Sequence, residues 1–524
     1  MPKHFSIYSI LSVVFVEGAA VMVAELTAGM LVAPFFGTSL ISWALVLSIT
    51  LLGLASGYFL GGILAAKKNI ALLFTAILFL GGVLCALIPI LGSVVMPIFM
   101  DWNLELGLAA SLLIFLFPTL VCFGSMGPLA VALLSYYSSK AGRFTGMVYA
   151  LSTIGGIIAT LVFGLLLIPN YGILIPCFIT GSLVSSLAAI IAIQSKRMFW
   201  VATIVYLILG FSWVREKSQA ESSTGPMKVL HSSSGIMGEV KVVDFAWKVS
   251  HSSEVVLARA LTVNGVWQTA VSLKDGTSIL NYVYHVLPLV QKYPQESEIL
   301  VVGLGGGGLV GEMERKGYKP LVVEIDERLP ELTKSYFSAD LTQRVVVDDG
   351  RHFLNKSSRQ FEIIILDVFQ GETPPWHLLT LETFKSVKAC LKPNGMFIIE
   401  FFGGVEQEGN EAQAFLSVLK TLKKAGLLVK VVQVEDRENV IIASKKEINL
   451  RGVGYSGNTF VPKPIDDLSQ HEISLNSLDL SKAKILTDDL PILEKMSYPE
   501  AKQWRRYQNK IFRDNFIRQG ISLL

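Results

Sequence analysis

Charged side chains are scarce in the first part of this 524-residue chain. Residues 1–213 hold 7 of the 45 Lys and Arg residues and 4 of the 42 Asp and Glu residues. A soluble domain is usually about 25% charged, so this composition excludes an ordinary soluble fold for that part. The remaining residues carry acids and bases in equal number, and neither part has the basic excess of a nucleic-acid-binding protein. We therefore expect a membrane domain followed by a soluble domain, with no nucleic-acid partner.

Cysteine is also scarce, with 4 residues in the whole chain. Cys85, Cys122 and Cys177 lie in apolar stretches, and no pair has the spacing of metal ligands. Neither a disulfide framework nor a metal site is expected. No removable signal peptide is expected either, because the first apolar segment is too long and others follow it.

Long hydrophobic runs fill the first part, and a bilayer span needs about 20 apolar residues. Seven segments approach that length: 6–33, 40–65, 70–99, 106–135, 144–168, 172–193 and 198–214. The Lys and Arg residues before residue 214 lie at the N-terminus or after the second, fourth and sixth segments. This pattern predicts a multi-pass α-helical bundle in the plasma (inner) membrane with a cytoplasmic N-terminus. Seven spans place the following domain outside the cytosol, whereas six place it inside if the last segment lies in the interface.

Two carboxylates stand inside the first apolar segment, at Glu17 and Glu25. A charge at membrane depth is costly unless it faces a cavity or a partner. These residues therefore mark either a cation path or polar site, or a structural hydrogen bond within the bundle.

The second part divides by pattern into four segments. Residues 215–226 are a polar linker after the membrane domain of residues 1–214, and residues 227–275 alternate as a small β domain does. Residues 276–445 alternate strands and helices, which predicts an α/β Rossmann-like parallel sheet covered on both faces. Residues 446–524 form a C-terminal extension with a basic helix, either solvated or lying on anionic lipid. Ligands of such a sheet bind at the carboxyl ends of its strands.

A glycine-rich run, VVGLGGGG, joins a buried strand to a helix. Gly303, Gly305 and Gly308 satisfy G-x-G-x-x-G, and Gly307 stands in the same run. Glycines allow a tight turn and a close approach of ligand to backbone. Glu324 ends the next strand, where an acid accepts hydrogen bonds from ribose hydroxyls. The pair predicts a nucleoside site, with a purely structural turn as the alternative.

Two further acids follow strands. Asp349, before Gly350, is expected either to accept a hydrogen bond from an adenine amino group or to cap the next helix. Asp367 ends the run FEIIILD. A carboxylate there either takes a proton from an amine nucleophile or holds that amine in line, and a turn cap is again the alternative.

Residues 299–402 resemble the class I S-adenosylmethionine-dependent transferases and, more closely, the spermidine synthases, which are polyamine aminopropyltransferases. The resemblance rests on the glycine run, Glu324-Ile325-Asp326, Asp349-Gly350, Asp367 and Leu391-Lys392-Pro393-Asn394-Gly395. Residues 263–268 (VNGVWQ) resemble the L-D-G-x-x-Q element of that family, and residues 227–270 resemble its β-hairpin domain. Residues 486–494 (LTDDLPILE) and the apolar first part resemble the membrane-fused members.

The resemblance implies a donor, S-adenosylmethionine or its decarboxylated form. Glu324 is then expected to hold the ribose, Asp349 the adenine, and Gln268 the amino-acid or aminopropyl end. Asp367 is expected to be the catalytic base or amine-orienting acid. The acceptor is a small amine or the donor itself, and a homodimer is left open.

The chain also departs from the family pattern. Soluble spermidine synthases have a second acid after the fourth strand, where this chain has Gln370. Residues 281–285 (NYVYH) match the family's Y-H-E element poorly, which argues against putrescine because two carboxylates are missing or displaced. The residues left to line a different acceptor pocket, or to pack, are Tyr282, Tyr284, His285, Gln370, Trp376 and His377.

The leading expectation is a membrane-bound enzyme that transfers an aminopropyl group to an amine and releases methylthioadenosine. Methyl transfer, and cyclisation or cleavage of the donor itself, remain alternatives. A cation transporter with a nucleoside-sensing domain is the alternative from another class.

Overall fold

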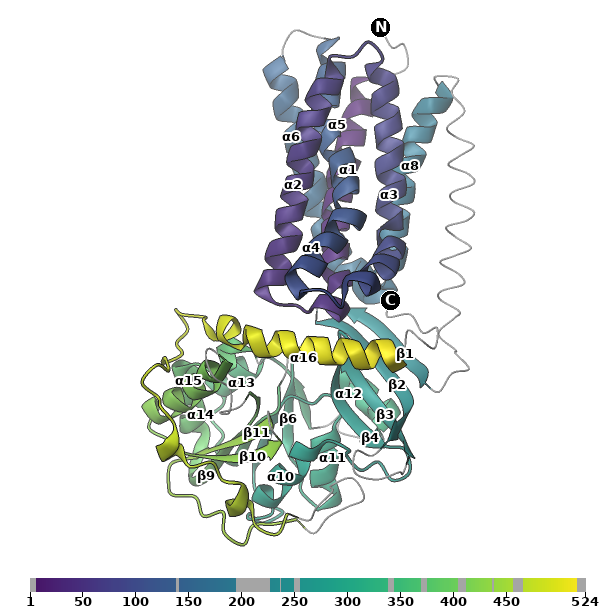
Figure 1. Ribbon diagram of the computed structural model, residues 1–524. Coiled ribbons are helices and arrows are strands. Elements are labelled where there is room, and N and C mark those ends of the chain that lie inside the picture. The colour runs from purple at the N-terminus through teal and green to yellow at the C-terminus, as the bar shows by residue number, and fades with distance from the viewer. Residues whose placement is uncertain are drawn as a thin grey trace. The chain divides into compact units, whose positions relative to one another are not determined.

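The computed structural model describes residues 6–137, 141–194, 227–235, 237–248, 255–337, 344–368, 375–403, 411–435, 438–455 and 465–515. Two compact units are present. The first contains residues 1–223, 232–240 and 508–524, and the second contains residues 224–231 and 241–507. Figure 1 shows the helices of the first unit and the sheets of the second.

The first unit is a bundle of apolar helices. Its helical segments are α1 (Ile7–Phe36), α2 (Leu40–Ala65), α3 (Ile70–Phe99), α4 (Leu104–Phe115), α5 (Phe117–Ser135), α6 (Ala141–Val162), a π-helical turn (Phe163–Leu167), α7 (Ile168–Tyr171) and α8 (Leu174–Gln194). Within the described residues, 6 helices are long and apolar enough to cross a membrane. The seventh predicted span, residues 198–214, lies outside the described residues.

The predicted span 106–135 consists of two helices, α4 and α5, which is a correction to the sequence-based expectation. The break is at Leu116, whose φ and ψ are −102° and −49°. Pro118 stands in the first turn of α5. A proline has no N–H to continue the preceding helix and its ring clashes with the previous turn, so a new helix starts there.

Glu17 is buried where α1 meets α6. The Oε2 atom of Glu17 accepts a hydrogen bond of 3.2 Å from the Ser152 hydroxyl. A Cβ on Gly18 would fall 2.0 Å from the Ser152 carbonyl oxygen, so the two helices are in backbone contact. Glu17 thus has a structural hydrogen bond, and Glu25, on the same helix, is partly buried.

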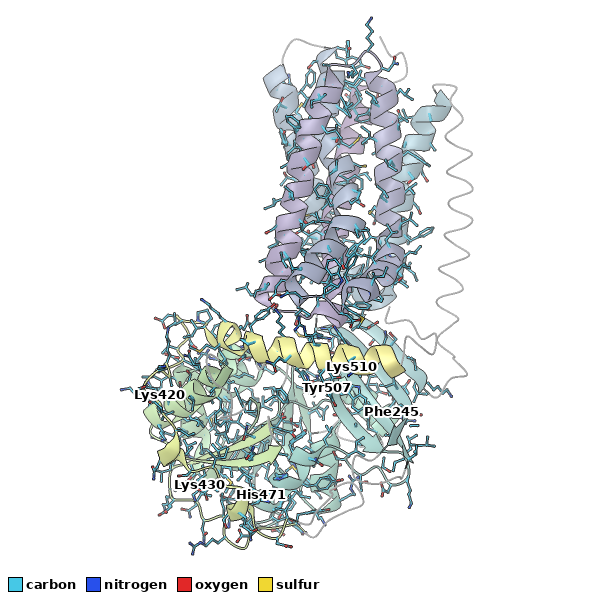
Figure 2. All side chains as sticks on the ribbon, viewed as in Figure 1. Phe245, Lys420, Lys430, His471, Tyr507 and Lys510 are labelled. Carbon is cyan, nitrogen blue, oxygen red and sulfur yellow. The ribbon has the colours of Figure 1, made fainter. Side chains whose placement is uncertain are left out.

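The second part of the chain begins with a four-stranded sheet in the order β1-β2-β3-β4. Its strands are β1 (Met227–Gly235), β2 (Gly238–Lys248), β3 (Val255–Val263) and β4 (Val266–Ser272). The β3–β4 turn contains Asn264 and Gly265, whose φ values of 50° and 74° are typical of a tight hairpin turn. Phe245 (labelled in Figure 2) and Trp267 pack together in this sheet, with ring centroids 4.7 Å apart.

A seven-stranded sheet follows, in the order β10-β11-β9-β8-β5-β6-β7. Its strands are β5 (Ile299–Val302), β6 (Leu321–Glu324), β7 (Val345–Val347), β8 (Phe361–Leu366), β9 (Leu391–Phe402), β10 (Leu428–Glu435) and β11 (Glu438–Ser444). The accompanying helices are α10 (Asn281–Val290), α11 (Gly308–Arg315), α12 (Leu329–Phe337), α13 (Gly350–Lys356), α14 (Leu381–Cys390), α15 (Glu411–Lys424) and α16 (Leu493–Asn515).

The strands β7, β6, β5, β8 and β9 are parallel, and β11 and β10 add an antiparallel edge. This arrangement confirms the predicted α/β Rossmann-like fold. In the sheet, β6 lies on one side of β5 and β8 lies on the other side. The strand order therefore reverses between β5 and β8, and in open α/β sheets ligands bind at the carboxyl ends of such a pair.

The two faces of the sheet differ in what covers them. Phe401 is fully buried in a large core with Phe384 of α14 and Phe415 of α15. Because side chains alternate along a strand, Glu400 and Phe402 point to the opposite face. Helix α10 packs against β10 and β11.

Candidate active site

The glycine turn after β5 is required by its own geometry. Gly303, Gly305 and Gly307 have φ values of 99°, 54° and 75°, a backbone region that favours glycine. A Cβ on Gly303 would fall 2.0 Å from the carbonyl oxygen of Asp367, at the end of β8. The turn and the end of β8 are therefore in direct contact, as a site at the β5/β8 boundary requires.

Glu324, the last residue of β6, is fixed against this turn. Its Oε2 atom accepts a 2.8 Å hydrogen bond from the Leu304 N–H, and its Oε1 atom accepts one of 2.8 Å from the Asp326 N–H. Burial raises the pKa of the Glu324 carboxyl, and these N–H groups oppose the rise. Each carboxylate oxygen keeps capacity for another donor, so Glu324 can also accept a hydroxyl group.

The strand β4 brings Gln268 to the same turn. The Thr269 hydroxyl accepts a 2.8 Å hydrogen bond from the Gly306 N–H. A Cβ on Gly305 would lie 3.7 Å from the Cβ atom of Gln268. The small sheet thus places Gln268 beside Gly305, and the Gln268 amide nitrogen lies 3.5 Å from the Val266 carbonyl oxygen.

Asp349 is the N-cap of α13, the alternative that the sequence left open. One of its carboxylate oxygens accepts a 2.9 Å hydrogen bond from the His352 N–H, and the other lies 3.0 Å from Nε2 of His377. Burial would raise the pKa of Asp349, but these hydrogen bonds outweigh it and hold the pKa below its ordinary value. Gly350 packs against β5, because a Cβ there would fall 2.3 Å from Val302.

The segment that contains Asp488 closes the Asp349 side. Arg351, two residues after Asp349, forms a two-pronged ion pair with the Asp488 carboxylate, with one contact of 2.7 Å. The Leu381 N–H donates a 2.8 Å hydrogen bond to the Leu486 carbonyl. The LTDDLPILE segment singled out in the sequence therefore supports the loop that holds Asp349.

Asp367 lies at the centre of the boundary between β5 and β8. Its Oδ2 atom accepts a 3.0 Å hydrogen bond from the Tyr282 hydroxyl of α10. Burial raises the pKa of Asp367 to about 6, the Tyr282 hydrogen bond lowers it, and the negative charge of Glu324 raises it. A carboxyl group with a pKa near neutrality suits proton transfer.

Two acids beside Asp367 are absent from the sequence-based prediction. In the register of β9 and β11, Glu400 pairs with Val440 and Glu438 pairs with Phe402, so Glu400 and Glu438 are diagonal neighbours on one face. Burial raises the pKa of Glu400 well above its usual range, and the charges of Glu438 and Asp367 and a hydrogen bond with Glu438 add to this. The signal in the sequence is a single acid within the apolar run of β9.

Several predicted pocket residues have other partners. The Tyr284 hydroxyl donates a 2.5 Å hydrogen bond to the Ser278 carbonyl. The Nδ1 atom of His285 lies 3.1 Å from the Asn281 carbonyl, and its ring packs against His471. The Trp376 ring packs on the core beside α14. Gln370 lies outside the described residues. The structure thus brings Tyr282 to Asp367 and gives Tyr284, His285 and Trp376 packing contacts.

Comparison with known proteins finds relatives of the second part of the chain. Residues 281–437 match the model of the spermine/spermidine synthase domain. The polyamine aminopropyltransferase of Hamiltonella defensa is 27% identical over 189 residues, or 33% of this chain and 62% of that protein. The enzyme of the same name from Desulforudis audaxviator is 31% identical over 160 residues, or 28% of this chain and 54% of that protein. The chain therefore spans 54–62% of the length of these two relatives.

One relative extends further. Polyamine aminopropyltransferase 2 of Aquifex aeolicus is 23% identical over 466 residues, or 83% of this chain and 87% of that protein. That similarity must include part of the apolar helical unit. Among solved structures, a probable spermidine synthase from Corynebacterium glutamicum is 16% identical with a TM-score of 0.37, covering 51% of this chain and 98% of that one. Residues 281–437 are therefore similar to the spermine/spermidine synthase domain, and the chain as a whole is similar to the Aquifex protein named above.

Proposed function

We propose that this protein transfers an aminopropyl group from decarboxylated S-adenosylmethionine to an amine. The observation that carries the proposal is Asp367, a partly buried carboxylate that accepts the Tyr282 hydroxyl and has a raised pKa. It lies against the Gly303 turn at the point where the strand order reverses. The relatives named above carry this activity in their names.

The donor is assigned to the glycine-turn side of Asp367. Glu324 accepts the ribose hydroxyls, since its two carboxylate oxygens accept backbone N–H groups and keep lone pairs for further donors. The Asp349 loop receives the adenine, and its carboxylate is oriented by His352 and His377. Gln268, whose Cβ atom lies near Gly305, is assigned to the reacting end of the donor.

The reaction needs one bond made and one broken. The lone pair of the amine nitrogen attacks the aminopropyl carbon attached to the sulfonium, and that carbon–sulfur bond breaks with its electrons going to sulfur. Neutral methylthioadenosine leaves, and the proton of the alkylated nitrogen passes to Asp367. Positioning supplies most of the rate, because the thioether is already a good leaving group.

The acceptor is assigned to the side of Glu400 and Glu438. The sequence lacks the second acid of the soluble enzymes at Gln370, which argued against a diamine. The Glu400–Glu438 pair restores acidic groups beside Asp367, from β9 and β11 instead of the loop after β8. A hydrogen bond to a charged group contributes roughly 1.5–3 kcal/mol, enough to select a cationic amine.

The test is a donor titration combined with identification of the nucleoside product, using the full-length protein in detergent. Aminopropyl transfer releases methylthioadenosine when decarboxylated donor and a diamine are present. Formation of S-adenosylhomocysteine instead would establish methyl transfer, and methylthioadenosine without an amine product would establish cleavage of the donor. Nucleoside binding without any product would support the sensor alternative and overturn the proposal.

The six long apolar helices serve as a membrane anchor in this proposal. Loops without Lys or Arg alternate with loops that carry them, which gives a cytoplasmic N-terminus. An even number of spans then places the enzymatic unit in the cytosol.

A further inference from the structure

The C-terminal helix α16 crosses the carboxyl edge of the large sheet. Near its start, Leu493 is buried in the core that contains Phe415 of α15. Farther along, Trp504 contacts Phe402, the last residue of β9, on the opposite face of the sheet. Figure 1 shows α16 running from the neighbourhood of α15 toward the small sheet. The carboxyl edge is where the proposed substrates bind, so α16 lies beside them.

Trp504 packs on Phe402, the neighbour of the two acids of the acceptor side. The ring centroids of Trp504 and Phe402 are 4.7 Å apart. Phe402 pairs with Glu438 across β9 and β11, and it shares a face with Glu400. Tyr507, labelled in Figure 2, stacks on Trp504 with centroids 5.6 Å apart and an interplanar angle of 28°. Phe402 therefore connects the stacked rings of Trp504 and Tyr507 to the Glu400–Glu438 pair.

The next residue of the helix reaches the donor side. Arg505 is 1% exposed, and its Nη1 atom donates a 2.9 Å hydrogen bond to the Asn264 carbonyl. Asn264 begins the β3–β4 turn, and four residues later β4 carries Gln268. Thr269 then bonds to the glycine turn. Arg505 is thus connected to the donor site through a turn and a short strand.

We propose that α16 completes the active site, with Trp504 as a wall of the amine pocket and Arg505 as a positioning residue for the donor-binding turn. The inference rests on the proposed function. An indole face attracts a cation and covers an alkyl chain, so Trp504, which packs on the cross-strand partner of Glu438, suits a linear aliphatic amine with two or more amino groups. Arg505 does not touch the donor and acts through the backbone of Asn264.

The first arm of the test measures amine affinity by calorimetry, with putrescine, cadaverine and spermidine added to full-length protein in detergent. Trp504→Ala is expected to weaken binding of these amines about tenfold and to reduce the discrimination among them, whereas Trp504→Phe keeps part of both. Lys495→Gln, at an exposed position on the same helix, is the matched control and should bind as the wild type does. Unchanged affinities and unchanged preference in Trp504→Ala would overturn the Trp504 assignment.

The second arm measures donor affinity. Arg505→Met removes the hydrogen bond to Asn264 with little change in side-chain volume, and should weaken donor binding about fivefold while amine affinity stays within about twofold. Arg505→Lys retains a donor group and should recover part of the loss. An equal loss of donor and amine affinity, with no recovery in the Lys variant, would mean that Arg505 only supports the fold.

The outcomes separate this inference from the proposed function. If the wild type binds amines and forms methylthioadenosine but Trp504→Ala is unchanged, the inference fails and the function stands. If the wild type binds amines with a Trp504-dependent preference and forms no product, the pocket is correct and the reaction is wrong. A wild type that binds none of the amines contradicts both.

Discussion

Asp367 is the residue on which the proposed chemistry depends. Its carboxylate accepts a hydrogen bond from Tyr282. In the proposed reaction it orients the attacking amine and takes its proton. Asp367→Asn should lower kcat by roughly 10²–10⁴-fold, the usual contribution of a general base. Donor affinity should remain within about twofold, because Asp367 does not hold the nucleoside in this account. A variant that loses donor binding to the same extent as turnover would assign Asp367 to the donor site.

The pH dependence follows from the same residue. Burial raises the pKa of Asp367 to about 6, so the active carboxylate form is lost as pH falls through that value. The rate at subsaturating amine should therefore rise with pH through about 6 before the amine's own titration dominates. Profiles of kcat/KM from pH 5 to pH 9 check this, and Asp367→Asn should lack the acidic limb. An acidic limb that survives in the variant would belong to another group.

Glu400 gives a prediction that combines binding and stability. Glu400→Gln should raise the KM for the amine about tenfold, because Gln cannot become the carboxylate that a bound ammonium group favours over the protonated acid. The same substitution should stabilise the folded protein at neutral pH, although it weakens amine binding. The folded-state pKa of Glu400 lies above its usual value, so the native state binds this proton more tightly than the unfolded state does. Wild-type stability should then decrease as pH rises above the ordinary Glu range, and Glu400→Gln should remove part of that decrease.

Thermal unfolding of both proteins at pH 5 and pH 8 measures the stability effect. Met396→Leu, a buried apolar exchange on the same strand, is a control that leaves the charge unchanged. If Glu400→Gln destabilises the protein equally at both pH values, the account of Glu400 is wrong.

At this scale, the sequence predicted the residues that end apolar strands. Glu324 and Asp367 each close a run of buried β residues, and that local pattern is visible without a structure. Glu400, Glu438 and Trp504 could not be predicted in the same way. They come together through the antiparallel register of β9 and β11 and through a helix about a hundred residues later in the chain. For Asp349 the sequence left two alternatives, an adenine contact or a helix N-cap. The structure shows the N-cap.

Among the elements, the turn between β5 and α11 has the strictest requirements. Gly303 combines a positive φ with a backbone contact to Asp367 that leaves no room for a Cβ atom. Gly303→Ala should therefore lower the unfolding temperature of the second unit and abolish measurable donor binding. Gly311→Ala, inside α11, meets only the end of the Arg315 side chain at 3.9 Å and should be neutral or slightly stabilising. Equal behaviour of the two variants would show that the turn is not constrained as described.

The elements also show where pattern reading fails. Alternating strands and helices predicted the parallel sheet, because periodicity and burial are local properties. The span 106–135 was expected as one helix, since hydropathy does not register the break before Pro118. Burial of Tyr284 and His285 on α10 likewise depends on neighbours, Glu312 and His471, that sequence spacing does not reveal.

At the scale of the whole molecule, the low charge of the first part and the ordinary charge of the second correspond to two compact units. The helical unit has six helices of membrane-spanning length among the described residues. With six spans, protease added to sealed inside-out vesicles should digest the enzymatic unit, and protease added to right-side-out vesicles should not. The reverse pattern would require an odd number of spans, with residues 198–214 as the seventh.

The central claim is that the aminopropyl group of the donor is transferred to an amine at Asp367. The most direct measurement uses decarboxylated S-adenosylmethionine labelled in its aminopropyl carbons, a linear diamine and the purified full-length protein, with products identified by mass spectrometry. The account predicts labelled carbons in a lengthened amine and an equal amount of methylthioadenosine, both strongly reduced in Asp367→Asn. Unlabelled amine and intact donor after incubation, or label released without transfer to the amine, would contradict it.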